Sequence, residues 1–279
     1  IASEKLEEII PQSEIIFVAT PSKIINDVLD RLTDFSIDNK MIISCTKGIN
    51  ENPFMTMSEA IEKHFNNSSI KVGVLSGPNL AKEIADEKVA GTVIASKHAD
   101  LCHQAREILS SSTFKIYTSD DIKGIELAGA LKNIYAIISG YCHSLDVGEN
   151  AIGLILTRSM AEMSNFAVNK GANPITFLGL AGMGDLVATC FSKLSRNYQF
   201  GWAIGEGLDI EAAKYKVGQV AEGLNTIRII HNEISSSKIK MPLVSGMHEI
   251  LFNSGSKELL LEQIINSDIY VDVDFDVES

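Results

Sequence analysis

Cysteine is scarce in this chain of 279 residues, which has only four: Cys45, Cys102, Cys142 and Cys190. No CxxC pair occurs, and neighbouring cysteines are at least 40 positions apart. This spacing excludes a cysteine-based zinc site, and we expect no bound metal. The cysteines have apolar neighbours, which favours free, reduced thiols in the core of a cytoplasmic protein.

Positive charge is also in short supply. The chain has 24 Lys and Arg residues against 36 Asp and Glu residues, which gives a formal net charge of −12. This balance argues against a broad surface that tracks phosphates, so we expect no nucleic-acid partner. An anionic small molecule remains compatible with it, because a few cations can converge in one cleft of an acidic protein.

The sequence lacks a long uninterrupted apolar run and a secretory leader. The longest apolar stretch, residues 125–145, contains Glu126, Lys132 and several polar groups, so we expect no stable membrane insertion. The first ten residues are charged and amphipathic, unlike a signal peptide. They have no initiator methionine and read as the middle of a helix, so we expect the natural product to have residues before Ile1.

What is present is a globular composition with 45% apolar and 22% charged residues. Over the first 119 residues, short β-branched runs alternate with helical patterns. This alternation predicts an α/β sheet of mostly parallel strands, with ligands at their carboxyl ends. The expected strands cover residues 15–19, 41–44, 71–75, 91–95 and 114–118, and the expected helices cover residues 22–32, 53–65, 79–85 and 99–109.

After Asp120 the pattern becomes helical, which divides the chain into an α/β domain (1–120) and an all-α domain (121–279). The sequence ends in an acidic tail, which we interpret as a frayed, solvated end rather than an added strand. The expected helices cover residues 122–143, 151–170, 175–180, 185–190, 199–205, 210–216, 223–235, 243–252 and 256–266.

Two charged residues in the helical half are candidates for chemistry. Lys132 lies in a segment rich in Leu, Ala, Ile and Gly; burial there would lower the pKa of its ammonium and suit a proton donor, whereas a lysine that extends to the surface is the alternative. Asn133 beside it either orients a ligand or faces solvent. Asp185 follows a glycine-rich turn, and it either caps the next helix or is buried against a cation such as Lys132.

Four polar turns complete the candidates. Lys47 lies in a Thr-Lys-Gly turn after a strand, and the turn at residues 76–79 (Ser-Gly-Pro-Asn) leads into a helix and suits an anion. Residues 195–197 (Ser-Arg-Asn) offer donors to a phosphate, and Glu222 in residues 220–223 can accept from a hydroxyl. Each has a plain alternative as a surface turn, a polar loop or a helix cap. No GxGxxG motif follows a strand, so the dinucleotide fingerprint is missing.

Taken in order, six segments resemble the bacterial type of the NAD(P)-dependent glycerol-3-phosphate dehydrogenase family. The segments are CTKG (45–48), SGPNLAKE (76–83), ELAGALKNIYAI (126–137), GLAGMGDLVATC (179–190), SRN (195–197) and GQVAEG (218–223). The resemblance implies a Rossmann-like N-terminal domain, incomplete here because the family's opening glycine-fingerprint unit is lacking. It also implies an all-α C-terminal domain of the 6-phosphogluconate dehydrogenase C-terminal-like type.

The implied reaction is reversible hydride transfer between NAD(P)H and dihydroxyacetone phosphate, a phosphorylated three-carbon substrate. The product would be sn-glycerol 3-phosphate for phospholipid synthesis, made by a cytoplasmic homodimer that uses NAD or NADP. Two alternatives stay open. One is another β-hydroxyacid-type dehydrogenase of the same architecture, and the other is a non-catalytic, degenerate paralogue.

The resemblance also implies residue roles. Lys132 matches the proton donor and acceptor, with Asp185 and Lys47 as further catalytic residues. Asn79 stands where the family usually has Thr or Ser, although its amide can still bond a hydroxyl or phosphate. The expected substrate-binding residues are Lys47, Gly77, Asn79, Lys132, Asn133, Asp185, Ser195, Arg196 and Asn197. The expected cofactor-binding residues are Lys47, Ala81, Arg196, Val220 and Glu222.

Overall fold

The computed structural model describes residues 3–66, 69–218, 221–256 and 258–265. The chain divides into two compact units, residues 1–127 (the sheet unit) and residues 128–279 (the helical unit). This division falls inside the long helix α6 (Ile122–Ser144), whereas a boundary at residue 120 stays a prediction. Val220 and the acidic tail lie outside the described residues.

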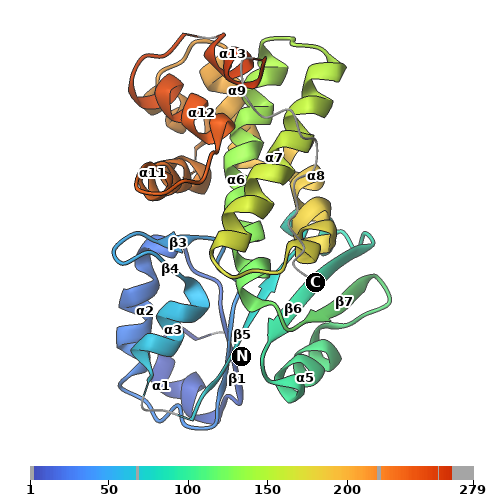
Figure 1. The fold of residues 1–279 in the computed structure, drawn as a ribbon. Coiled ribbons are helices and arrows are strands. Elements are labelled where there is room, and N and C mark those ends of the chain that lie inside the picture. The colour runs from blue at the N-terminus through green and yellow to red at the C-terminus, as the bar shows by residue number, and fades with distance from the viewer. Residues whose placement is uncertain (1–2, 67–68, 219–220, 257, 266–279) are drawn as a thin grey trace, which may run out of the picture. The chain divides into compact units, whose positions relative to one another are not determined.

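The sheet unit contains a five-stranded sheet in the order β1-β2-β5-β6-β7 (Figure 1). Every strand predicted from the sequence is confirmed, with ends within one residue of those expected. The strands are β1 (Ile15–Val18), β2 (Met41–Ser44), β5 (Lys71–Ser76), β6 (Ala90–Ser96) and β7 (Phe114–Ser119).

Three of the four strand pairs are parallel, as expected, but β5 and β6 run antiparallel. The connection between them explains the reversal. It holds only the five-residue helix α4 (Ala81–Ala85), which is too short to carry the chain back along the sheet as a parallel crossover requires. The parallel strands β1, β2 and β5 end at the same edge, and the predicted ligand turns follow β2 and β5 there.

Both faces of the sheet are covered by apolar helices. On one face Ile42 and Val72 pack with α2 (Ile25–Leu32) and α3 (Met57–His64). On the other face Ile43 packs with α5 (Ala99–Leu109). Successive strand residues point to opposite faces, and Ile42 and Ile43 are both fully buried. This double burial explains why β2 reads as a continuous apolar run.

The helix expected over residues 53–65 begins later than predicted. Within that range residues 55 and 56 instead form β4 (Met55–Thr56), which pairs with β3 (Ile49–Asn50) in a two-stranded ribbon. Helix α3 begins at Met57 because Thr56 and Glu59 form a capping box, in which the Thr56 hydroxyl accepts from the Glu59 N–H and the Glu59 carboxylate accepts from the Thr56 N–H. The T-x-x-E spacing at residues 56–59 was the signal for this start.

From residue 3, where the described part of the chain begins, the opening segment forms a short helix, α1 (Leu6–Ile9), followed by a 3₁₀ turn (Ile10–Gln12). Pro11 lies within that turn, and it has no N–H to continue an α-helix. A second 3₁₀ turn (Ser22–Ile24) precedes α2, so the helix predicted over residues 22–32 is confirmed in two parts.

The first turns of α6 belong to the sheet unit and are tied to α3. The buried Glu126 carboxylate accepts from the Ser58 N–H at 2.9 Å and from the Ser58 hydroxyl. Burial raises the pKa of Glu126 to about 7, although the bonds from Ser58 oppose that shift. The Glu126 carboxyl therefore changes between its neutral and charged forms near pH 7.

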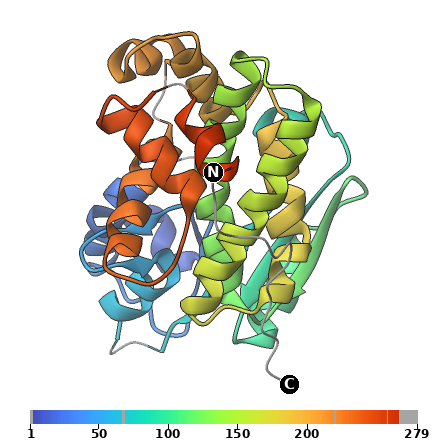
Figure 2. The same ribbon diagram turned by 45° about the horizontal axis from the view of Figure 1, so that its top comes forward.

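The helical unit is all-α over its described residues, as predicted. Its two longest helices, α6 and α7 (Glu149–Asn169), lie side by side in both views (Figures 1 and 2). A 3₁₀ turn, η3 (Pro174–Leu178), and a π turn, η4 (Leu180–Gly184), replace the helix expected over residues 175–180. The remaining helices are α8 (Asp185–Cys190), α9 (Arg196–Gly205), α10 (Ile210–Val217), α11 (Glu222–Ser235), α12 (Pro242–Phe252) and α13 (Leu259–Ile265).

A buried polar contact joins α6, α7 and α12. The Tyr135 hydroxyl donates to the Glu162 carboxylate at 3.1 Å, and the Leu243 N–H donates to the same carboxylate at 2.7 Å. Burial raises the pKa of Glu162 to about 8. The carboxyl therefore accepts bonds from two neighbouring helices of the unit.

No helix within the described ranges is both long enough and apolar enough to cross a bilayer.

The four cysteines are free, as predicted; three are buried and Cys45 is half-buried. Burial raises the pKa of Cys142 and of Cys190 to about 12, which keeps both thiols protonated and unreactive.

Candidate active site

Lys132 lies in the middle of α6 with 6% of its surface exposed. Its Nζ is 2.5 Å from Asp185 Oδ1 and 2.7 Å from Thr189 Oγ1. The alternative of a lysine that extends to the surface is therefore wrong. A charge taken out of water needs a partner of opposite sign, and the predicted partner, Asp185, occupies that place.

Asp185 is the first residue of α8 and is 1% exposed. It does not cap the helix: Gly184 holds the N-cap position, and no side chain caps α8. The π turn before it depends on Gly182, where an added Cβ would lie 2.2 Å from the Phe177 carbonyl oxygen. This close backbone approach brings the first turn of α8, and with it the carboxylate, to the Lys132 ammonium.

Thr189 completes the contact and was not predicted from the sequence. Its hydroxyl donates to the Asp185 backbone carbonyl at 2.6 Å and accepts from the Lys132 ammonium. The two bonds use one donor and one acceptor of the hydroxyl, so the side chain orients the amine. Its position four residues after Asp185, on the same face of α8, was the available signal.

A second buried contact in the helical unit involves Asn133 and Asn197. Asn197 Nδ2 donates to Asn133 Oδ1 at 2.9 Å, and Asn197 Oδ1 accepts from the Gly223 N–H at 3.0 Å. An added Cβ on Gly223 would lie 2.5 Å from the Asn133 carbonyl oxygen, so the start of α11 packs directly on α6. Asn133 does not face solvent, because 6% of its surface is exposed.

Residues 195–197 form the start of α9, so the interpretation as a polar loop is wrong. Ser195 is the N-cap, and its hydroxyl accepts from the Tyr198 N–H at 3.3 Å. Arg196 is the first residue of the helix and is exposed, and Glu222 is the first residue of α11. The side chains at positions 196 and 222 have further interactions within the protein.

In the sheet unit, Lys47 and Gly77 lie at the carboxyl ends of neighbouring strands. Lys47 Nζ donates to the Gly77 carbonyl at 2.6 Å. Gly77 has φ +150°, and an added Cβ would lie 3.1 Å from Thr92 Cα, so a side chain is disfavoured there. Lys47 is therefore held over the turn that follows β5.

Asn79 is anchored through its nitrogen while its oxygen is buried. Nδ2 donates to Thr92 Oγ1 at 3.0 Å, and Thr92 donates to the Ser76 carbonyl at 3.0 Å. Among the described residues, Asn79 Oδ1 and the Ser76 hydroxyl are buried without a hydrogen-bond partner. The helix expected from residue 79 begins at Ala81. The turn thus offers a buried acceptor and a buried hydroxyl to a ligand.

The structure joins the predicted residues into two groups, one in each unit. Lys47, Gly77 and Asn79 cluster in the sheet unit, and Ala81 opens the short helix that follows. Lys132 and Asp185 form one contact in the helical unit, and Asn133 and Asn197 form another. An α/β sheet with the predicted ligand turns at its strand ends, followed by a helical unit with a buried lysine–carboxylate pair, fits the class of a two-domain dehydrogenase.

Comparison with known proteins gives the family. Residues 1–102 match the family described as NAD-dependent glycerol-3-phosphate dehydrogenase N-terminus, and residues 121–262 match its C-terminus. The chain belongs to the NAD-dependent glycerol-3-phosphate dehydrogenase family. The predicted resemblance is therefore confirmed, and so is the prediction of an NAD(P)-dependent enzyme.

Curated relatives agree along nearly the whole chain. Glycerol-3-phosphate dehydrogenase [NAD(P)+] from Pseudomonas syringae pv. tomato is 47% identical over 263 residues, which is 94% of this chain and 76% of that protein. The enzyme of the same name from Alcanivorax borkumensis is 44% identical over 274 residues, which is 98% of this chain and 79% of that protein.

Solved structures confirm the fold class. Glycerol-3-phosphate dehydrogenase from Coxiella burnetii is similar with a TM-score of 0.89 and 31% identity, covering 94% of this chain and 79% of that one. The enzyme from Plasmodium falciparum has a TM-score of 0.87 at 22% identity, covering 97% and 78%, and supports the fold alone. The fold is thus a Rossmann-like sheet domain with a helical C-terminal domain.

Proposed function

We propose that Lys132, held by Asp185 and Thr189, is the proton donor in the reaction that this chain catalyses, the interconversion of dihydroxyacetone phosphate and sn-glycerol 3-phosphate with NAD(P)H. The observation that carries this proposal is the buried contact of Lys132 Nζ with Asp185 Oδ1 at 2.5 Å. A general acid must be positioned before it can act, and two neighbours fix this ammonium.

Reduction of the ketone requires a proton at the carbonyl oxygen. In the direction of reduction, Lys132 Nζ gives one proton to the C2 oxygen, which becomes a hydroxyl; in oxidation, the neutral amine takes that proton back. Asp185 stabilises the ammonium form and so keeps Lys132 charged in its buried position. The Thr189 hydroxyl is held by its bond to the Asp185 backbone carbonyl, and it fixes the position of Lys132 Nζ by accepting from it.

The sheet unit fits a dinucleotide. Among the described residues of the sheet unit, buried hydroxyl oxygens without partners occur at Thr20, after β1, and at Ser76, the last residue of β5. Both lie at the carboxyl ends of their strands, where open α/β sheets bind nucleotides. When bound, NAD or NADP supplies and accepts the hydride. We propose that the residues that contact it are Lys47, Ala81, Arg196, Val220 and Glu222.

For the substrate, we propose that Lys47 and Arg196 provide the positive charge that a phosphate ester requires. Asn79 offers its buried Oδ1 as an acceptor, which suits a substrate hydroxyl better than a phosphate oxygen. Asn133 follows Lys132 on α6, and its amide oxygen accepts from the amide nitrogen of Asn197 on α9. The full proposed substrate set is Lys47, Gly77, Asn79, Lys132, Asn133, Asp185, Ser195, Arg196 and Asn197.

A truncated substrate tests the phosphate assignment. Arg196→Met should lower kcat/KM for dihydroxyacetone phosphate by roughly 10–100-fold, the scale of a lost charge-assisted bond. Because Arg196 is also proposed to contact the cofactor, both substrates are compared at saturating NADPH. There the same substitution should leave kcat/KM for dihydroxyacetone, which has no phosphate, unchanged within about twofold. An equal loss with both substrates would contradict the assignment of Arg196 to the phosphate.

We further propose that the protein is a homodimer in the cytoplasm and that the sn-glycerol 3-phosphate it makes is used in phospholipid synthesis. The absence of a bilayer-spanning helix among the described residues is compatible with this location. Sedimentation of the purified protein tests the dimer: a single species of 30.3 kDa would contradict it.

A further inference from the structure

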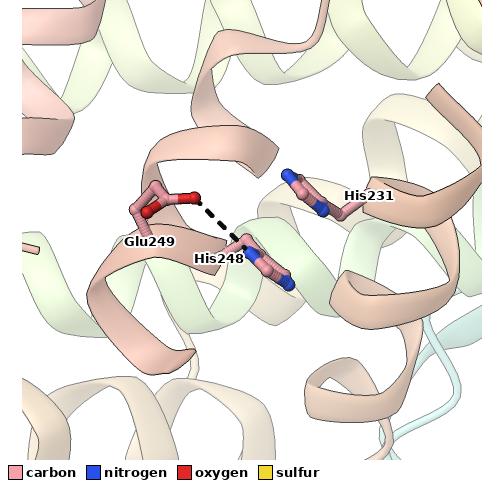
Figure 3. A group of neighbouring side chains, drawn as sticks. All are labelled: His231, His248 and Glu249. Atoms are coloured by element: carbon pink, nitrogen blue, oxygen red, sulfur yellow. Dashed lines mark ion pairs between the residues drawn. The ribbon is translucent and has the colours of Figure 1, made fainter. Parts of the chain in front are cut away.

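Two histidines of the helical unit face each other between α11 and α12, apart from the catalytic candidates. The rings of His231 and His248 are stacked, with their centroids 3.7 Å apart and their planes 5° from parallel (Figure 3). Glu249, next to His248 on α12, points its carboxylate toward the same place. One nitrogen of each ring and one oxygen of the carboxylate lie within 4.8 Å of one another.

One atom of this group lacks the partner that its burial requires. Among the described residues, His248 Nδ1 is buried without a hydrogen bond. Glu249 Oε1 is 3.9 Å from this nitrogen, which is too long for a hydrogen bond. Buried polar atoms in native proteins are almost always satisfied, so the gap between this nitrogen and this oxygen points to a bound species.

The size of the gap fits a metal ion. Two ligands on one tetrahedral Zn²⁺, with Zn–N and Zn–O distances near ~2.1 Å, lie roughly 3.4 Å apart. The observed N···O distance of 3.9 Å is close to that value. The His231 ring would rotate out of the stack to direct its nitrogen toward the same ion, a side-chain movement that leaves both helices in place.

The donor set selects the kind of metal. Two imidazoles and one carboxylate suit Zn²⁺ and its neighbours in the transition series, rather than the oxygen-seeking Mg²⁺ or Ca²⁺. Arg228 is held over the Phe252 ring, 5.1 Å from its centroid, and its charge acts against a cation here.

A neighbouring amide already orients the carboxylate. Asn253 Nδ2 donates to both oxygens of Glu249, at 3.0 and 3.1 Å. Such a bond to a metal-binding carboxylate fixes its direction before the ion arrives. The Glu249 side chain is 42% exposed, so water can reach the site and complete the coordination.

We propose that His231, His248 and Glu249 bind one divalent transition-metal ion of the Zn²⁺ class, with water as the fourth ligand. The ion ties α11 to α12. This site is independent of the proposed function, because none of its residues takes part in proton transfer or substrate binding. It was missed from the sequence because only the cysteines were considered as ligands, and the two histidines are 17 residues apart on different helices.

Cobalt provides a direct test, because four-coordinate Co²⁺ absorbs strongly in the visible range. The untagged full chain is treated with a chelator, kept in a reductant that contains no thiol, and titrated with Co²⁺. We expect absorption bands that saturate at one equivalent and disappear when Zn²⁺ is added. Thermal unfolding should shift to higher temperature with either metal.

Four variants test the site: two remove a proposed histidine ligand, one removes the supporting amide, and one is a control. His248→Ala and His231→Ala should abolish the bands. Asn253→Ala keeps all three ligands and should weaken Co²⁺ binding by about 10–100-fold, the usual effect of losing such a support. The control is His103→Ala on α5, which removes an exposed histidine 3.5 Å from a glutamate and should leave binding unchanged.

Two results would overturn the proposal. The first is that Co²⁺ produces no absorption bands and Zn²⁺ produces no heat of binding at concentrations up to about millimolar. This would mean that only water fills the gap. The other is unchanged binding in the His231→Ala, His248→Ala double variant, which would place the metal elsewhere, for example on a cysteine. Circular dichroism of each variant confirms that the loss of binding is not a loss of the fold.

Discussion

Replacing Glu162 with glutamine should remove a pH dependence of stability from the helical unit. The carboxyl is buried beneath α12, where it accepts from the Tyr135 hydroxyl and from the Leu243 N–H. The charge of Arg158 lowers the pKa of this carboxyl, but the effect of burial is larger. Burial raises its pKa from 4.5 to about 8. The folded protein thus binds a proton here that the unfolded chain releases well below neutral pH.

The sign follows from proton linkage. Because the folded state holds the proton more tightly, Glu162 contributes its full stabilisation below about pH 4.5 and loses it as the pH rises toward 8. The slope between these limits is about 1.4 kcal/mol per pH unit. From pH 5.5 to 7.5 the contribution should therefore fall by about 2–3 kcal/mol.

Glu162→Gln is nearly isosteric and cannot ionise. Its amide oxygen can accept from the Leu243 N–H, and its nitrogen can donate to the Tyr135 oxygen. Urea unfolding at several pH values measures the difference in free energy of unfolding between the two proteins. The only tryptophan, Trp202, lies in α9 and reports on the unit that contains Glu162.

The control is Glu211→Gln on the exposed surface of α10, which should leave the pH dependence unchanged. The wild-type protein should lose stability relative to Glu162→Gln as the pH rises. A difference between the two that stays constant within about 0.5 kcal/mol from pH 5.5 to 7.5 would refute the assignment of a raised pKa.

Three further perturbations test contacts around the site. Gly182→Ala forces a Cβ against the Phe177 carbonyl, so kcat should fall by about 10-fold or more through misplacement of α8, with an unchanged far-ultraviolet spectrum; an unaltered kcat would contradict the positioning argument. Asn197→Ala removes an acceptor from the first turn of α11 and should cost about 1–3 kcal/mol in urea unfolding, whereas Asn197→Asp should lose less. Ser58→Ala removes a hydroxyl that donates to the Glu126 carboxylate. Because the pKa of Glu126 is about 7, this variant should lose more unfolding free energy above pH 7 than below pH 5, as measured by unfolding followed by circular dichroism.

The strands were predictable because each is a short run rich in β-branched residues. Strand β2 is buried on both faces, whereas Ile116 is the one buried residue of the edge strand β7. The direction of β6 was not, because apolar patterning carries no information about orientation, and only the shortness of α4 decides it. The starts of α3 and α9 were misplaced by a few residues. Both depend on side-chain caps, at Thr56 and Ser195, that outweigh the apolar pattern.

Energetics favoured a lysine–carboxylate pair, but the sequence also left open a lysine that extends to the surface and an aspartate that caps the helix. Lys132 and Asp185 are isolated charges in apolar segments, and two such charges must pair to be buried. Thr189 was harder to predict. Its position four residues after Asp185 was a weak signal, because threonine is common in helices, and the bond to the amine is seen in the three-dimensional contact. The amide contact between Asn133 and Asn197 joins segments 64 residues apart, which no local pattern connects.

The central claim is that the Lys132 ammonium delivers the proton to the substrate, and Lys132→Met tests it most directly. Single-turnover reduction of dihydroxyacetone phosphate should slow by about 10²–10⁴-fold, while the dissociation constant of NADPH, measured by fluorescence, stays within about threefold. A Lys132→Met protein that reduces the ketone within threefold of the wild-type rate would contradict the account.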